Sequence, residues 1–186
     1  RSVRWFSLLF TTRLVLSLTR DEPGLDGQLV AGQAQRLAGN GFFHILKPKK
    51  YGGLELSEAV HAQVTMTLAQ GCASTAWVFS ILSGDNGLFL CYPEDVQDEV
   101  WGTDSYATLA GYTGYNPRAK VETVDGGYRV SGSWAYCSGS DFSSWLIFVI
   151  PIGEHGEPHV IIVPNEKSTT VDDWFPTGMR GTGSRT

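Results

Sequence analysis

Residues 131–145 read Ser-Gly-Ser-Trp-Ala-Tyr-Cys-Ser-Gly-Ser-Asp-Phe-Ser-Ser-Trp, a stretch that mixes the signals of a strand and of a turn. Trp134, Tyr136 and Trp145 are typical of a strand surface. Ser138-Gly-Ser140 is typical of a turn that offers a hydroxyl and backbone N–H groups where a flat ligand can approach closely. Taken alone, the stretch is more typical of an ordinary aromatic strand and turn than of a ligand site. The surrounding sequence must therefore decide between the two interpretations.

The bulk properties indicate a globular protein and argue against a nucleic-acid partner. The 186 residues are 42% hydrophobic, which is enough for a real core in one domain or two small ones. A net charge of −5 argues against a nucleic-acid partner. Three cysteines without metal-type spacing favour a reducing, cytoplasmic compartment. Residues 3–18 are apolar, but Arg4 and Arg13 interrupt them, so they favour an amphipathic first helix over a membrane span or signal peptide.

Hydrophobic periodicity predicts helices in the first half of the chain and strands in the second. The expected helices cover residues 25–38, residues 57–70 with Ser57 as cap, a buried helix capped by Ser74, and a helix from Pro93 to about Trp101. The expected strands cover residues 105–110, 119–124, 128–131, 134–137, 145–152, 159–163 and 169–174, with a loop over residues 111–117. Helices followed by strands predict an α+β fold, with a helical domain at residues 1–104 and a β domain at residues 105–186.

The common signatures of catalysis are missing from the sequence. His155 and His159 are four residues apart, but the glycines and proline around them exclude a shared helical face, so no metal site is expected. The chain also lacks a nucleophile elbow, a dinucleotide-binding fingerprint and a phosphate-binding loop. What remains is a buried aromatic helix followed by two loops rich in Gly, Ser and Thr, at residues 111–118 and 138–144. This combination suits a planar cofactor held between helices and sheet.

Six short motifs then occur in a recognisable order. They are residues 45–53, 72–77, 92–94 together with 100–102, 124–132, 134–145 and 178–184. In this order and spacing the chain resembles the flavin-dependent monooxygenases of the acyl-CoA dehydrogenase superfamily, which are the oxygenase components of two-component aromatic hydroxylases. The resemblance implies an N-terminal helical domain, a middle β-barrel-like domain and a C-terminal four-helix bundle. We expect this chain to stop at Thr186 before the bundle, so that the fragment itself binds flavin weakly or not at all.

The same resemblance implies a chemistry and a set of partners. A separate reductase would deliver reduced FMN or FAD, and dioxygen would react with the flavin to form a hydroperoxide. The distal oxygen would then pass to an aromatic or polycyclic small molecule, without a metal. A homotetramer in the cytoplasm, with no membrane partner, is the implied assembly.

The resemblance also implies roles for individual residues near the opening stretch. Ser138 takes the position of the hydroxyl that bonds the reactive central-ring nitrogen of the flavin, and Tyr136 that of an aromatic residue near the ring. Cys137 and Gly139 complete this contact segment. Gly111 and Thr113 take positions in a loop that flanks flavin and substrate.

One helical position is the second expected catalytic site. Asp85 stands where related hydroxylases often carry a histidine that contacts the phenol, so it would act as a base or hydrogen-bond acceptor. Its surroundings, Gly84-Asp-Asn-Gly87, are equally typical of an exposed turn. Phe142 likewise replaces a histidine that follows an aspartate in relatives. These departures bear on a phenolic substrate more than on flavin use.

Two further functions stay open from the sequence. The first is an acyl-CoA dehydrogenase-type FAD oxidoreductase, although Thr113-Gly-Tyr-Asn-Pro117 replaces the Thr-Glu-Pro loop of those enzymes. The second is an inactive, truncated fragment that would expose apolar surface.

Overall fold

A computed structural model describes residues 27–186 of the chain, so the expectations for residues 3–18 lie outside the described part. The helices are α2 (Gly27–Gly39), α3 (Glu58–Ala69), α4 (Ala73–Phe89) and α5 (Glu94–Gln97), which continues as a π-helical turn over Asp98–Gly102. All four agree with the helices expected from hydrophobic periodicity. Ser57 flanks α3 as expected, but its side chain makes no capping hydrogen bond. Cys72, and not Ser74, precedes α4.

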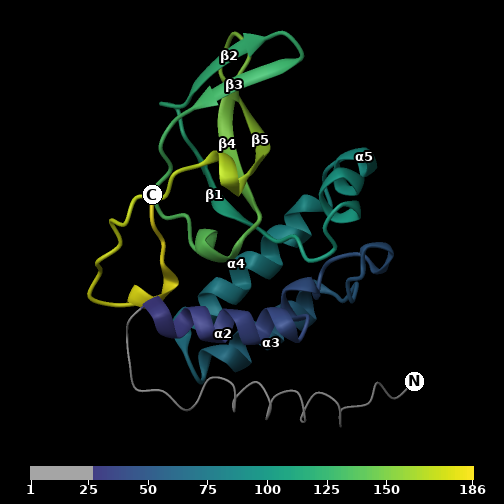
Figure 1. The fold of residues 1–186 in the computed structure, drawn as a ribbon, viewed down its shortest axis with the longest axis vertical. Coiled ribbons are helices and arrows are strands. Elements are labelled where there is room, and N and C mark those ends of the chain that lie inside the picture. The colour runs from purple at the N-terminus through teal and green to yellow at the C-terminus, as the bar shows by residue number, and fades with distance from the viewer. Residues whose placement is uncertain (1–26) are drawn as a thin grey trace.

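Helix α4 is central to the fold (Figure 1). It contacts α2 and α3 on one side and strand β1 (Leu109–Tyr115) on another. Val78, Phe79 and Leu82 are completely buried, in one core with Leu68 of α3. Because α4 is apolar on most of its surface, burial from two sides is the arrangement that removes most of that surface from water.

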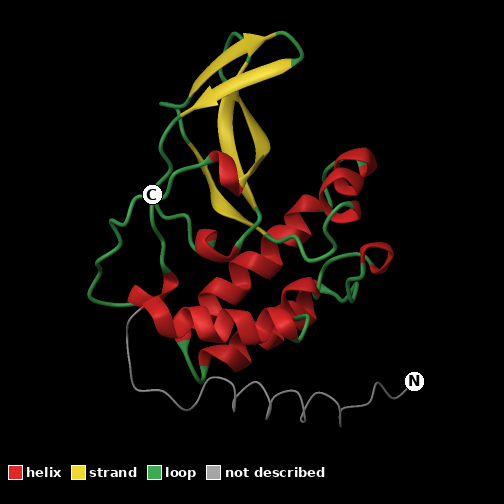
Figure 2. Cartoon of the chain, viewed as in Figure 1, coloured by secondary structure: helices red, strands yellow, loops and turns green. Residues whose placement is uncertain are grey.

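The strands form two small sheets (Figure 2). Besides β1, they are β2 (Lys120–Val124), β3 (Gly127–Ser131), β4 (Trp145–Ile152) and β5 (Glu157–Pro164). The three-stranded sheet has the order β1-β4-β5, with β1 parallel and β5 antiparallel to β4, while β2 and β3 form a separate hairpin. The hairpin turns at Asp125-Gly126 as predicted, and Gly126 takes the positive φ of 80° that such a turn needs.

Several details of the β region differ from the sequence prediction, and the first is that β1 begins at Leu109 and not at residue 105. Residues 111–115 belong to β1, and not to a loop, because they pair with β4. Residues 134–137 form no regular strand: Cys137 makes an isolated bridge with Arg185, and the Trp134 ring stacks on Phe148 at 4.4 Å between centroids. Residues 169–174 are not a strand either: the N–H of Val171 donates to the carbonyl oxygen of Thr186 at 2.7 Å.

The β region is therefore an open arrangement over the described residues, and not a closed barrel. Its core contains Leu146, Phe148 and Ile150 of β4 together with Cys137. A separate aromatic cluster of Tyr51, Phe89 and Trp101 joins the end of α4 to the segment that leads into β1. No helix within residues 27–186 is long and apolar enough to cross a bilayer.

Candidate functional site

One long-range hydrogen bond marks the junction between helices and strands. The indole Nε1 of Trp77, on α4, donates to the hydroxyl oxygen of Ser138 at 3.0 Å. Ser138 lies in the turn after residue 137 and is 5% exposed. The expected site hydroxyl is therefore buried at α4, a helix that contacts both halves of the fold.

Unusual backbone angles shape the turn around Ser138. Tyr136 has a φ of 65° and Gly139 a φ of 79°. A Cβ on Gly139 would lie 3.3 Å from Cγ of Leu82, so glycine satisfies both the angle and the close approach to α4. The N–H of Ser138 donates to the carbonyl oxygen of Tyr136 at 2.9 Å, and that of Ser140 to Cys137 at 3.3 Å. The expectation of free N–H groups is wrong for these two residues.

Two residues near the C-terminus extend the site in a way that sequence reasoning missed. The hydroxyl of Ser184 lies 2.5 Å from that of Ser138, and 2.7 Å from the hydroxyl of Thr182. Thr182 in turn donates to the carbonyl oxygen of Met179 at 3.0 Å. All three hydroxyl-bearing residues are buried. The signal was present in the motif of residues 178–184, but its partner 46 positions earlier follows from the fold alone.

Two exposed aromatic residues are associated with Ser138: Trp77 bonds its hydroxyl, and Tyr136 precedes it by two positions. The Tyr136 ring is 63% exposed and meets Trp174 edge-on, with 6.0 Å between centroids. Trp77 is 47% exposed although its N–H reaches Ser138. Large exposed aromatic side chains beside a buried polar group are typical of a surface that binds a flat molecule.

Cys137 has a structural environment. Its thiol donates to the carbonyl oxygen of Trp134 at 3.2 Å, and its N–H donates to the carbonyl oxygen of Arg185 at 2.9 Å. Burial, with a smaller effect of Asp173, raises the pKa of the Cys137 thiol to about 11. The thiol is therefore neutral near pH 7, and the backbone N–H of Cys137 holds the C-terminal segment against the turn.

Gly111 and Thr113 both lie in β1. A Cβ on Gly111 would come within 2.1 Å of the carbonyl oxygen of Ile147, so the glycine is required for close pairing with β4. The side chain of Thr113 is outside the described part of the structure. Ala110 and Gly139 approach one another next to Leu82, so the start of β1 does border the Ser138 turn.

Asp85 lies on α4, eight residues beyond Trp77, which corresponds to about 12 Å along the helix axis. It lies within the length of α4 and is partly buried, so it is not an exposed turn residue, which was the alternative interpretation of the sequence. Its Oδ2 atom is buried and has no hydrogen-bond partner among the described residues. Burial raises the pKa of the Asp85 carboxyl to about 7. Near pH 7 such a carboxyl is present in both its protonated and its ionised form, so it is suited to accept or hold a proton.

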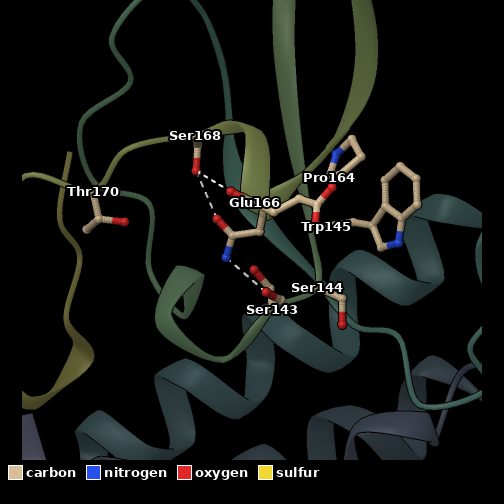
Figure 3. Close-up of a pocket in the computed structure, with 8 residues that line it drawn as sticks. Ser143, Ser144, Trp145, Pro164, Glu166, Ser168 and Thr170 are labelled. Carbon is tan, nitrogen blue, oxygen red and sulfur yellow. Dashed lines mark hydrogen bonds between the residues drawn. The ribbon is translucent and has the colours of Figure 1, made fainter.

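Two hollows open elsewhere on the β region. One, of about 670 Å³, lies between the segment 143–145 and the end of β5 (Figure 3). Asn165 spans its wall and donates to the carbonyl oxygens of Ser140 and Ser143 at 2.8 and 2.9 Å. The second, of about 720 Å³, lies beside the β2–β3 hairpin. Neither is lined by Ser138 or Asp85.

The residues around Ser138 fit a flat heterocyclic cofactor such as a flavin. A buried hydroxyl, two exposed aromatic rings and a glycine turn against α4 supply a polar contact, flat faces and close backbone approach. The orphaned Asp85 oxygen adds a polar group on the same helix. Within residues 27–186 no group of three or more His, Cys, Asp or Glu side chains is arranged to hold a metal ion.

Comparison with known proteins gives consistent matches. Residues 21–92 match the acyl-CoA dehydrogenase N-terminal domain. The oxygenase subunit HsaA of a flavin-dependent monooxygenase from Mycobacterium tuberculosis (strain H37Rv) is 37% identical over 149 residues, covering 78% of this chain and 37% of the relative. The oxygenase component of an FADH(2)-dependent resorcinol hydroxylase from Rhizobium sp. is 36% identical over 162 residues, covering 84% of this chain and 39% of the relative.

Solved structures agree with these sequence matches. The HsaA monooxygenase of M. tuberculosis superposes with a TM-score of 0.75 at 32% identity, over 96% of this chain and 45% of that one. XiaF from Streptomyces sp., in complex with FADH2 and glycerol, gives 0.77 at 27% identity, over 97% and 48%. The chain thus spans less than half the length of the relatives it matches.

Proposed function

We propose, because this chain is homologous to the oxygenase components of flavin-dependent monooxygenases in the acyl-CoA dehydrogenase superfamily, that it acts within such an oxygenase. The reaction would be hydroxylation of an aromatic or polycyclic small molecule with reduced flavin and dioxygen. The observation that carries the proposal is the hydrogen bond from Trp77 to Ser138, which places a buried hydroxyl where helices and strands meet.

The flavin site would be built around that hydroxyl. Reduced FMN or FAD supplies the electrons that activate dioxygen when it is bound. Ser138 would contact the central ring, and the exposed rings of Tyr136 and Trp77 would pack beside it and exclude water. Cys137 and Gly139 would contribute the backbone that keeps the turn close to α4. Gly111 and Thr113 would border the site from β1.

Asp85 would act on the substrate. Its buried, unpartnered oxygen lacks a hydrogen-bond donor within the described residues, and a substrate hydroxyl would be such a donor. Because burial raises its pKa to about 7, the carboxyl could take the hydroxyl proton near neutral pH, which makes an aromatic ring more electron-rich.

The wider organisation follows from the same relationship. The relatives are named as oxygenase subunits or components, which supports a separate reductase that supplies reduced flavin. We propose a helical domain at residues 1–104, a β domain at residues 105–186, and a homotetramer for the whole protein.

Anaerobic titration tests the proposal. Reduced FMN and FAD are added separately to the full-length protein that contains this chain, and tryptophan fluorescence is followed because Trp77 would lie at the site. We expect saturable quenching by at least one reduced flavin, and transfer of oxygen to an aromatic substrate after air is admitted. Absence of quenching by both reduced flavins would contradict the proposal. Bleaching of oxidised FAD by an acyl-CoA would instead favour the dehydrogenase function.

A further inference from the structure

The hydrogen bonds around Ser138 have a direction that the chemistry of the groups determines. A carbonyl oxygen can only accept, so Thr182 must donate its single hydroxyl hydrogen to Met179. Thr182 then has no hydrogen left for Ser184, and Ser184 must be the donor between these two hydroxyls. Ser184 has likewise used its hydrogen, so Ser138 donates to Ser184.

The indole of Trp77 forms the other end of this chain of hydrogen bonds, which we call the relay. An indole N–H can only donate, so Ser138 accepts from Trp77. The full relay runs from Trp77 through Ser138, Ser184 and Thr182 to the carbonyl oxygen of Met179. Ser138 has therefore committed its hydrogen, and one lone pair is all that it can offer to a bound molecule.

This free lone pair has a consequence for flavins, because their central-ring nitrogen N5 changes its hydrogen-bonding character with oxidation state. In a reduced flavin N5 carries a hydrogen and can donate, whereas in an oxidised flavin N5 can only accept. We propose that Ser184 is a positioning residue that holds Ser138 as a hydrogen-bond acceptor, so that the site selects reduced over oxidised flavin. The inference rests on the proposed function, since it concerns the same flavin contact.

The segment that carries Ser184 is held firmly against the Ser138 turn. The N–H of Cys137 donates to the carbonyl oxygen of Arg185 at 2.9 Å. The guanidinium of Arg185 pairs with Asp141 at 3.3 Å and with Asp172 at 3.2 Å. These contacts of Arg185, the residue after Ser184, keep Ser184 close to Ser138. The direction of the hydrogen bonds is set at the two ends, because the Trp77 N–H can only donate and the Met179 carbonyl oxygen can only accept.

An oxidised flavin does not match this relay, because its N5 needs a hydrogen-bond donor and Ser138 is held as an acceptor. For Ser138 to donate to N5, its hydrogen would have to leave Ser184, and the buried Ser184 oxygen would lose its donor. One unsatisfied hydrogen bond of this kind typically changes an equilibrium about fivefold. Replacing Ser184 by alanine removes the acceptor, so the Ser138 hydrogen becomes free to point at the ligand.

The test compares the affinities of the full-length protein that contains this chain for oxidised and for reduced FMN and FAD, measured anaerobically by quenching of tryptophan fluorescence. The ratio of the oxidised to the reduced dissociation constant should exceed one for the unmodified chain. We expect it to fall about fivefold in Ser184→Ala and to recover in Ser184→Thr, which restores a hydroxyl. The Thr182→Val variant, which frees the Ser184 hydrogen to donate to Ser138, should lower the ratio in the same direction.

Ser143→Ala is the matched control, because this hydroxyl bonds the carbonyl oxygen of Ser140 outside the relay. It should leave the ratio unchanged. An equal ratio in the unmodified chain and in both Ser184→Ala and Thr182→Val, with reduced flavin still bound, would overturn the inference and leave the proposed function standing. Failure of the unmodified full-length protein to bind any reduced flavin would contradict both the inference and the proposed function. If Ser184→Ala does not fold by near-UV circular dichroism, Thr182→Val decides.

Discussion

The indole Nε1 of Trp77 lies 3.0 Å from the hydroxyl oxygen of Ser138, and this bond connects residues 61 positions apart. It links α4 to the turn that leads into β4, where the helical and β parts of the fold meet. Since one partner is buried and the other partly exposed, the bond both stabilises the junction and orients a hydroxyl at its edge. Its energetic coupling can be measured directly.

A double-mutant cycle of Trp77→Phe and Ser138→Ala should give a coupling free energy of about 1 kcal/mol in urea unfolding. Phenylalanine keeps an aromatic ring but removes the donor, and alanine removes the acceptor. The same cycle with Ser143→Ala in place of Ser138→Ala should be additive. Additivity in the Trp77–Ser138 cycle as well would show that the bond contributes nothing to stability.

Asp85 should make the stability of the protein depend on pH. Its folded-state pKa of about 7 lies above the ordinary value of 3.8, so the native state binds more protons between these values. Stability contributed by the protonated carboxyl is present at low pH and is lost as pH rises through 7. Relative to Asp85→Asn, the free energy of unfolding should fall by about 2 kcal/mol from pH 5.5 to pH 8.

Chemical denaturation at several pH values measures this difference for Asp85. The exposed α5 residue Asp95 provides the control, because Asp95→Asn should run parallel to the unmodified protein. A pH dependence identical in Asp85→Asn and in the unmodified protein would mean that the carboxyl is solvated.

Lys47 should produce the opposite pH dependence at higher pH. Its side chain is completely buried, its Nζ donates to the carbonyl oxygen of Ser105 at 2.5 Å, and it lies 5.0 Å from the Trp101 ring centroid. Burial lowers the pKa of Lys47 to about 8, against an ordinary 10.5, although Asp104 partly opposes this effect. The unfolded chain therefore binds more protons between these values, and stability rises with pH in that window.

Relative to Lys47→Met, the free energy of unfolding should thus increase by roughly 2 kcal/mol between pH 7.5 and pH 10. Lys49→Met, at an exposed position, is the control and should show no such change. A flat difference between the unmodified protein and Lys47→Met would contradict the burial of the charge.

Gly111→Ala should destabilise the protein by about 2 kcal/mol or more. The added Cβ would come within 2.1 Å of the backbone oxygen of Ile147, so β1 and β4 would have to separate. Gly102→Ala is a suitable control, because no atom lies within 4 Å of a Cβ placed there, and it should change stability by less than about 0.5 kcal/mol. Thermal unfolding of both variants checks the prediction, and equal melting temperatures would contradict it.

Much of the local structure could be predicted from the sequence because it depends on neighbouring residues. Hydrophobic periodicity located α3 and α4, and the Asp125-Gly126 pair located the β2–β3 turn. Predictions failed where a distant segment decides the conformation. Residues 111–115 look like a loop because of their glycines, yet pairing with β4 makes them a strand.

The sequence by itself determined the order of helices and strands, and it singled out Ser138 within its glycine and serine turn. The tertiary structure alone decided what Ser138 touches. Trp77 lies 61 residues before it and Ser184 lies 46 residues after it, so no local pattern could pair them. The reason is physical: helix, strand and turn propensities act over a few residues, whereas a buried hydroxyl must be satisfied by whichever donors and acceptors the packed chain brings beside it.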